Sequence, residues 1–386
     1  MTDLVHEGGT GGEPAATWVV GPGTGWRVEW ATDGLITGSG KAATGHADWV
    51  RSAATTVVDG RAVAITGADD EAVLVWDLAT GERIGAALPA RGSVWTVATA
   101  IVDGRPVALV ADPSALVQSW DLAEGRPLAS LAGGAWAAAT GVVNGRPMVL
   151  VGRQNVPRLS MWDPATGEVV GDLVSDPPVG RIGAVVAVAT AVVDGHSEAV
   201  TLHDDSTVRA WNLTERLYQG QVAPPTGGNS QRVSLAVAVV SGRLVAVTGT
   251  WDGQVQVWDV ATCTEVTGRA PLTGHTGPVW ALAATVIDRR PLVITAGDDR
   301  TVRVWDMAAR RQVGSDLVFP SEVTAVTMAS DGRLVVGVGG DIAVLAPHPH
   351  AWARVDGDAV PLVVGESDEH RFEAMSSIAA PLIDED

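Results

Sequence analysis

The chain of 386 residues is 46% hydrophobic, and its 45 acids outnumber its 26 lysines and arginines to give a formal net charge of -19. This hydrophobic content supplies a large core and excludes an intrinsically disordered chain, whereas the negative charge argues against nucleic acid and anionic membranes as partners. The single cysteine, Cys263, excludes internal disulfides and a cysteine-rich zinc site. No segment resembles a signal peptide or a membrane span, so the sequence predicts a soluble, cytoplasmic protein.

The first complete structural unit follows Gly45-His46. Its first apolar run ends at Val58-Asp59-Gly60-Arg61, and Asp-Gly between two β-branched runs favours a tight hairpin, because such a turn requires positive φ. A second turn at residues 68–71 leads to a third run that ends at Trp76-Asp77, and another turn precedes a fourth run. The unit therefore predicts four short antiparallel strands.

The same landmarks return along the rest of the chain. The hairpin motif recurs as Val102-Asp103-Gly104-Arg105, Val143-Asn144-Gly145-Arg146, Val193-Asp194-Gly195-His196, Val240-Ser241-Gly242-Arg243, Ile287-Asp288-Arg289-Arg290 and Ser330-Asp331-Gly332-Arg333. The Trp-Asp pair recurs at Trp120, Trp162, Trp258 and Trp305, with Trp211-Asn212 as a variant. A period of about 45 residues with four strands each predicts a β-propeller, and seven hairpins predict seven blades. No segment shows a helical period, so we expect few helices.

These landmarks resemble those of the WD40 family. Gly45-His46 and Gly274-His275 are similar to its Gly-His element, and the Trp-Asp pairs are similar to its signature. The resemblance covers residues 35–347 and implies an all-β, seven-bladed WD40 propeller whose repeats are held by hydrogen bonds among a His, a Ser or Thr, an Asp and a Trp. Two repeats match this set in full: His46, Thr66, Asp70 and Trp76, and His275, Thr295, Asp299 and Trp305.

Other repeats depart from the set. Two lack only the His, and retain Thr201, Asp205 and Trp211, and Thr248, Asp252 and Trp258. The repeats that end at Trp120 and Trp162 carry Ser114 and Val156 where the Asp is expected. The single lysine, Lys41, against 25 arginines indicates a GC-rich bacterial genome, and the resemblance to bacterial propellers suggests a sensor or adaptor.

The last repeat shows only three strands, up to Pro347. The family closes its ring with an N-terminal strand, and an open ring would leave an unpaired edge. We expect residues 35–42 to supply that outer strand. The expected organisation is a flexible segment at 1–25, the propeller at 26–347 and an acidic extension at 348–386, in which nine acids face two arginines.

Several motifs invite a chemical interpretation that their context does not favour. Residues 38–41 lack the spacing and the helix of a phosphate loop, and His348-Pro349-His350 offers two metal ligands but no third. Because His46 and His275 match the repeat, we interpret them as structural rather than catalytic. His203 is expected in an exposed turn, and the first acid of each pair Asp69-Asp70 and Asp298-Asp299 is expected to be solvated. No catalytic residue, metal or cofactor is predicted.

One end of the ring carries the candidate binding residues. Counted back from the hairpin, the same position holds Arg51, Trp95, Trp136 and Trp280, but Val186 and Val233 in two other blades. Trp49 and Trp251 lie close to this end. Because Trp and Arg are enriched in binding hot spots, the six residues Trp49, Arg51, Trp95, Trp136, Trp251 and Trp280 are the predicted partner-binding face. The competing interpretation is that these tryptophans fill the space between blades as core.

The function that this pattern favours is a non-enzymatic scaffold or adaptor that binds a protein or peptide through its Trp-rich end. An alternative is an enzyme or a small-molecule-binding propeller that uses the central funnel, with the tryptophans forming an apolar or cation-binding cage. A third is a purely structural or oligomer-forming module. The absence of a convergent nucleophile, base or metal set favours the first.

Overall fold

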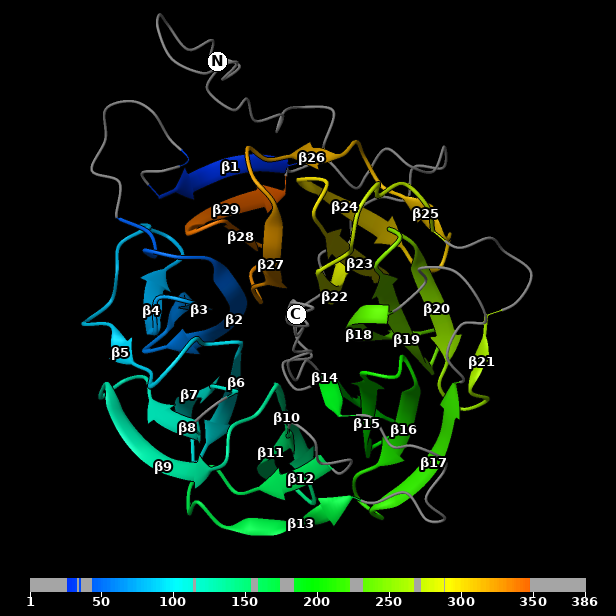
Figure 1. Cartoon of the computed structure of the whole chain (residues 1–386), viewed down its shortest axis with the longest axis horizontal. Coiled ribbons are helices and arrows are strands. Elements are labelled where there is room, and N and C mark those ends of the chain that lie inside the picture. The colour runs from blue at the N-terminus through cyan, green and yellow to red at the C-terminus, as the bar shows by residue number, and fades with distance from the viewer. Residues whose placement is uncertain are drawn as a thin grey trace, which may run out of the picture.

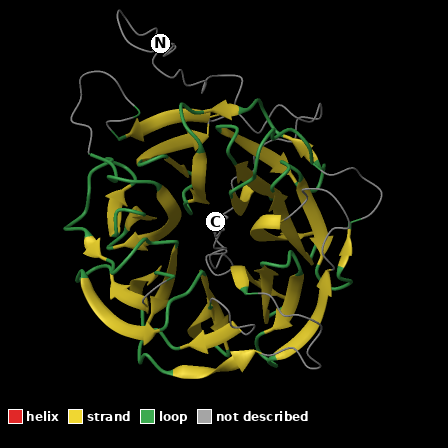
Figure 2. Ribbon diagram, in the orientation of Figure 1, coloured by secondary structure: helices red, strands yellow, loops and turns green. Residues whose placement is uncertain are grey.

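The computed structural model of the chain describes residues 26–32, 35, 44–113, 116–153, 159–173, 184–222, 232–266, 272–287 and 289–347. Seven sheets are arranged around a central axis, and the described residues contain no helix (Figures 1 and 2). The prediction of an all-β, seven-bladed propeller is confirmed. Within the described ranges, no helix has the length and apolar character needed to cross a membrane.

Each blade is an antiparallel sheet whose first strand lines the central axis (Figure 1). The first three blades contain β2 (Val50–Val58), β3 (Arg61–Ala68), β4 (Ala72–Asp77) and β5 (Leu88–Pro89); β6 (Thr96–Val102), β7 (Arg105–Ala111), β8 (Leu116–Asp121) and β9 (Arg126–Ala132); β10 (Ala137–Val143), β11 (Arg146–Gly152), β12 (Leu159–Trp162) and β13 (Val169–Leu173). Blades four and five contain β14 (Val185–Val193), β15 (His196–His203), β16 (Val208–Asn212) and β17 (Leu217–Val222); β18 (Arg232–Val240), β19 (Arg243–Thr250), β20 (Val255–Asp259) and β21 (Thr264–Glu265). Blade six contains β22 (Ala281–Ile287), β23 (Arg290–Ala296), β24 (Thr301–Asp306), β25 (Arg311–Gln312) and β26 (Leu317–Val318), and blade seven contains β27 (Val323–Met328), β28 (Leu334–Val338), β29 (Asp341–Pro347) and β1 (Trp26–Ala31).

The hairpins between the first and second strands have the turn that their sequence predicts. In blade one, Asp59 and Gly60 have φ of 49° and 76°, and the Asp-Gly, Asn-Gly and Ser-Gly pairs of blades two to five repeat this combination. Two consecutive positive φ values define the type I′ turn, whose twist matches that of the flanking strands. These turns fix the register of the first strands of blades one to five, and with it the residues that reach each end of the ring.

The ring is closed by an N-terminal strand, but not by the one expected. The outer strand of blade seven is β1, in which Trp26 pairs with Pro347 and Ala31 with Ala343. The expectation that residues 35–42 form this strand is therefore wrong: Leu35 lies in the turn after β1, and residues 36–43 lie outside the described part of the chain.

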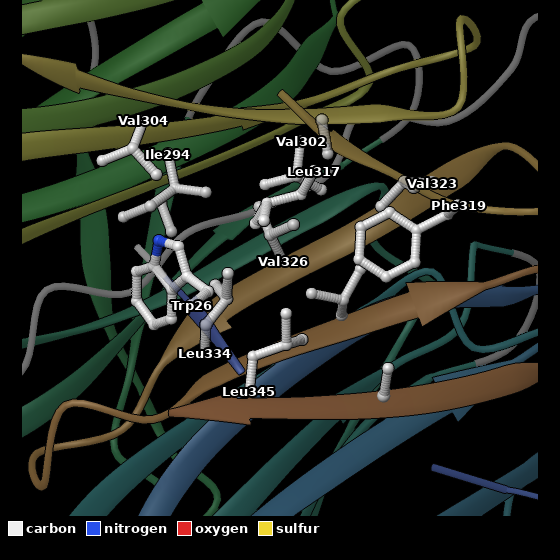
Figure 3. Close-up of a cluster of buried hydrophobic side chains, with 14 of the residues drawn as sticks. Trp26, Ile294, Val302, Val304, Leu317, Phe319, Val323, Val326, Leu334 and Leu345 are labelled. Atoms are coloured by element: carbon white, nitrogen blue, oxygen red, sulfur yellow. The ribbon is translucent and has the colours of Figure 1, made fainter. Parts of the chain in front are cut away.

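Burial explains why β1 occupies the closing position. Trp26 is 1% exposed and packs between blades six and seven, among Ile294, Val304 and Leu345 (Figure 3). Trp30 reaches the other way, donating from its Nε1 to the carbonyl of Leu78 in blade one at 2.9 Å. One strand thus ties the last blade to both of its neighbours, which a segment without aromatic anchors cannot do.

Neighbouring blades are joined by apolar clusters and by hydroxyl groups along the inner strands. Thr99 donates to the carbonyl of Thr55 at 3.0 Å, Thr140 to that of Thr99 at 2.8 Å, and Thr190 to that of Thr140. These four threonines occupy one position in blades one to four, so a ladder of hydrogen bonds links consecutive inner strands. The inner wall is therefore held laterally as well as by hydrophobic packing.

Candidate functional site

The two ends of the ring carry different features. At one end the chain enters each first strand and turns between the second and third strands; we call it the tryptophan face, after Trp95, Trp136, Trp251 and Trp280. At the other end lie the turns between the first and second strands of each blade; we call it the hairpin face. Because the strands of each blade are antiparallel, their connections alternate between these two faces.

The candidate residues lie where the chain enters the inner strands. In blade one the register of β2 and β3 shifts between Val50 and Ser52, which leaves Arg51 as the extra residue of a β-bulge, and a bulge re-aims a side chain away from the regular alternation. Counted from the hairpin, Trp95, Trp136 and Trp280 align with Arg51, but each directly precedes a first strand whose ladder is regular. The four residues therefore share a place at the strand entrance rather than one backbone irregularity.

Four of the predicted tryptophans form two pairs. The rings of Trp95 and Trp136, from blades two and three, have centroids 6.0 Å apart. Those of Trp251 and Trp280, from blades five and six, are 5.2 Å apart and meet edge to face at 88°. Both arrangements fall within the favourable range for aromatic pairs. The predicted face is therefore two aromatic pairs on separate arcs of the ring.

The two pairs differ in how exposed their members are. Trp95 and Trp136 are both half-buried, whereas Trp280 is only 5% exposed and Trp251 is 37% exposed. Trp280 is thus buried, and the exposed Trp251 packs against it edge to face. The interpretation that these tryptophans fill the core therefore fits Trp280, whereas Trp251 is exposed to solvent.

The first acids of the two Asp-Asp pairs differ in exposure. Asp69 is half-buried, contrary to expectation, and accepts from Nε of Arg51 at 2.8 Å. Asp298 is exposed, as expected, and accepts from Nε1 of Trp280 at 3.4 Å. In both blades the acid follows the second strand and meets the candidate residue at the entrance to the inner strand of the same blade. Trp49 is half-buried and makes no ring contact with another described aromatic residue.

The surroundings of the Trp251–Trp280 pair are acidic. Asp252 is exposed directly after Trp251, and Asp298 holds the indole of Trp280. Burial, and then the neighbouring charge of Asp298, raise the pKa of Glu322. Asp252 follows the exposed ring of Trp251, and Asp298 contacts its partner Trp280, so this end of the pair makes a surface that attracts cations, to which Glu322 adds a carboxylate near Asp298.

The two complete hydrogen-bonded sets lie behind the same face. In blade one, Trp76 Nε1 donates to Thr66 Oγ1 at 2.9 Å, His46 Nε2 lies 2.8 Å from that hydroxyl, and His46 Nδ1 lies 3.0 Å from Asp70. In blade six, Trp305, Thr295, His275 and Asp299 repeat the geometry. Each Asp also accepts a backbone N–H from the residue after the His, which fixes the loop that leads into the inner strand.

The pKa shifts of His46 and Asp299 are consistent with the hydrogen bonds in these sets. Burial lowers the pKa of His46, although Asp70 opposes this shift, so the ring is neutral at pH 7. A neutral ring can donate from Nδ1 to Asp70 and accept at Nε2 from the Thr66 hydroxyl, which leaves that oxygen free to accept from Trp76. In blade six, burial opposes ionisation of Asp299, but hydrogen bonds from His275, Thr301 and a backbone amide hold its pKa well below the usual range.

Blade four contains a histidine where the sequence predicted none. His203 is buried rather than exposed, and its Nε2 lies 3.0 Å from Thr201 Oγ1, which also accepts from Trp211 Nε1 at 3.0 Å. The expectation of an exposed turn His is wrong because His203 ends β15 and turns inward beside Thr201. Its place two residues after the Thr, on the same strand, was the available signal.

In blade five an arginine, rather than a histidine, lies beside the Trp–Thr pair. The guanidinium of Arg232 stands 4.4 Å from the ring of Trp258, whose Nε1 donates to Thr248 Oγ1 at 3.1 Å. Burial lowers the pKa of Arg232 to about 10, so it remains charged at pH 7. Sequence reasoning missed this residue, because no spacing rule of the repeat marks it.

Blades two and three retain the Trp but not its partners. The indole N–H groups of Trp120 and Trp162 are buried without a hydrogen-bond partner in the described part of the chain. Val110 and Val151 occupy the strand position that holds Thr66 in blade one. Ser114 and Val156 lie outside the described residues, as do Lys41 and the His348–His350 pair.

No group of three or more His, Cys, Asp or Glu side chains with metal-binding geometry occurs among the described residues. The acids and histidines described above hold loops, or the side chains of Arg51 and Trp280, in place. The most distinctive chemistry of the tryptophan face is therefore aromatic and acidic surface rather than a set of reacting groups.

Comparisons with known proteins identify the repeat type. A family model described as WD domain, G-beta repeat matches residues 227–259 and 267–306, which include β18 to β20 and β22 to β24. The crystal structure of the WD40 beta propeller domain of Doa1 is similar, with a TM-score of 0.63 and 18% identity over 85% of this chain and 99% of that one. No curated protein matches the sequence. The chain thus has two segments that match the WD repeat, and it has the fold of a WD40 propeller.

Proposed function

We propose that the protein is a non-enzymatic scaffold that binds a protein or peptide through its tryptophan face. The observation that carries this proposal is the Trp251–Trp280 pair. Trp251 is the one aromatic residue among the large exposed hydrophobic side chains of the described chain. A tryptophan held edge to face on a buried partner is already ordered, so binding costs it little conformational freedom.

The acidic residues near this pair favour a basic partner. Asp252 adjoins Trp251 in the chain and Asp298 contacts Trp280, so a basic side chain that stacks on Trp251 gains from the ring and from these carboxylates. We therefore propose a partner segment that carries arginine or lysine. The Trp95–Trp136 pair offers a second apolar contact on another arc, suited to an extended peptide.

Binding measurements on a Trp251→Ala variant test the proposal. Proteins captured from the native host by the wild-type chain are identified, and the affinity of the isolated partner is then measured. Truncation of an aromatic hot spot costs about 2 kcal/mol or more, so the affinity should fall at least about tenfold. Trp280→Ala is unsuitable for this purpose, because removal of a buried indole also destabilises the fold.

A matched control is available on another surface. Leu217 is 54% exposed at the start of an outer strand in blade four. Leu217→Ala removes a comparably exposed apolar side chain and should leave both affinity and stability unchanged. Undiminished binding by Trp251→Ala, with normal unfolding, would refute recognition through this pair.

A further inference from the structure

The hairpin face carries a ring of exposed apolar side chains at one repeated position. Val57, Ile101, Val192 and Val286, each the second-last residue of an inner strand, are between 40% and 54% exposed. Val142 and Val239 occupy the same position in blades three and five and are half-buried. These six residues are called the apolar ring below. Four of the eight large exposed hydrophobic residues in the described chain thus share one place in the repeat.

Regular hairpin folding does not require these residues to be apolar. In each hairpin the last strand residue, such as Val58 or Val102, packs inward, whereas its predecessor faces solvent. Six β-branched side chains around one opening form an unpartnered apolar surface, and such surfaces mark interaction sites. Blade seven departs from the pattern, because the second-last residue of its inner strand, Thr327, is polar and buried.

Arginines surround the apolar ring. The hairpin turns carry Arg61, Arg105, Arg146, Arg243, Arg289, Arg290 and Arg333, against the described aspartates Asp59, Asp103, Asp194 and Asp331. Arg61, Arg105 and Arg243 also approach the Asp of the Trp-Asp pair of their own blade. Arg146 is exposed and has no ion pair among the described residues. Arg105 also pairs with Glu124, and Arg333 pairs with Glu29 and Asp331, so the exposed Arg146 is the arginine most open to an added carboxylate.

The sequence after the propeller complements this surface. Strand β29 ends at Pro347 on the hairpin face, because it runs antiparallel to β28, which begins there. Residues 348–386 contain the run Val360-Pro361-Leu362-Val363-Val364, preceded by Asp356 and Asp358 and followed by Glu366, Asp368 and Glu369. An apolar centre between acids matches an apolar ring within arginines.

The connecting length is sufficient for contact. Residues 348–360 span up to about 40 Å when extended, at roughly 3.3 Å per residue. A propeller of this size has a radius of gyration of about 20 Å. The run can therefore reach any part of the ring from Pro347.

We propose that residues 348–386 fold back over the hairpin face, with the run 360–364 on the apolar ring and its flanking carboxylates on the arginines. This contact leaves the tryptophan face available. The inference does not depend on the identity of the partner at that other face.

Cross-linking within the full chain tests this proposal. Because Lys41 is the only lysine, an introduced lysine supplies one new amine that a carbodiimide can join directly to a carboxylate. Arg146→Lys places the amine on blade three, far around the ring from blade seven. Arg91→Lys places it in an exposed loop of the tryptophan face and serves as the control. Peptide mass spectrometry identifies the joined residues.

We expect Arg146→Lys to cross-link to acids at 356–369 within one molecule, with a yield at least fivefold above that of Arg91→Lys. Adding Val363→Asp, which leaves the propeller sequence intact, should lower the yield at least threefold, whereas Ser377→Asp adds the same charge and should not. Equal yields at the two lysine positions, or no effect of Val363→Asp, would show that residues 348–386 do not dock on the apolar ring. Cross-links only between two molecules would assign the apolar ring to a second copy. Either result overturns the proposal.

Discussion

Replacement of Thr66 by Val isolates the energetic role of the hydrogen-bonded set. The hydroxyl of Thr66 accepts from Trp76 Nε1 at 2.9 Å and lies 2.8 Å from Nε2 of His46, and both Thr66 and Trp76 are fully buried. Valine has nearly the same shape, so the change creates no cavity. It leaves two buried polar groups without a partner.

The expected cost follows from that count. Each orphaned buried group costs about 1–3 kcal/mol, so Thr66→Val should lower the free energy of unfolding by about 2–6 kcal/mol. Domains are typically stable by only about 5–15 kcal/mol, which makes this loss easy to detect in a urea titration. The exposed Thr273 provides the control, because Thr273→Val removes a hydroxyl that no buried group requires.

A second background separates this mechanism from general disruption of the blade. In a Trp76→Phe chain the indole N–H is already absent, so adding Thr66→Val should cost about 1–3 kcal/mol less than in the wild type. A cost below about 0.5 kcal/mol in the wild type would contradict the reasoning. An equal cost in both backgrounds would show that Trp76 does not depend on Thr66.

Other predictions concern protonation, closure and the inner wall. Because the folded pKa of His46 is lowered, protonation favours the unfolded chain, so the urea midpoint should fall as pH decreases below 6.5; an equal midpoint at pH 7.5 and 5.5 would argue against this. Trp26→Ala should cost about 3–5 kcal/mol in the same titration, against near zero for the exposed Arg27→Ala. Thr140→Val should cost about 0.5–1.5 kcal/mol through loss of its bond to Thr99, and an unchanged midpoint would show that the ladder does not stabilise the ring.

The number and kind of blades could be predicted because their signals are local. Each hairpin is defined by adjacent residues, such as Asp59-Gly60, whose positive φ values follow from the turn itself. Each Trp-Asp pair ends a third strand, and the Asp accepts the backbone N–H groups of the next turn, as Asp77 does from Ala79 and Thr80. Seven repetitions of a local pattern leave few other folds.

The closing strand could not be placed in the same way, because its partner lies more than 300 residues away. Residues 35–42 were favoured by their position just before the first repeat. The structure selects residues 26–31 because Trp26 and Trp30 fill sites in two different blade interfaces. Such packing depends on the assembled ring and leaves no local spacing to recognise.

The same limit applies to the side chains that complete each blade. His203 and Arg232 approach the Trp–Thr pairs of blades four and five from positions that the repeat does not specify. Either residue could have been identified only from its distance to the Trp or Thr. Repeat matching therefore finds what the blades share and misses how each blade compensates for what it lacks.

The recognition that we propose for the tryptophan face depends on such a departure. Three residues after the buried Thr, blades one and six place Asp69 and Asp298, which accept hydrogen bonds from Arg51 and Trp280 at the entrance to the inner strand. Blade five has Trp251 at that position, and its own bulge residue, Val233, has no polar group to hold. Trp251 instead contacts Trp280 of the next blade and stays exposed. Spacing alone grouped Trp280 with Trp95 and Trp136, although the side chain most available to a partner is the one that breaks the repeat.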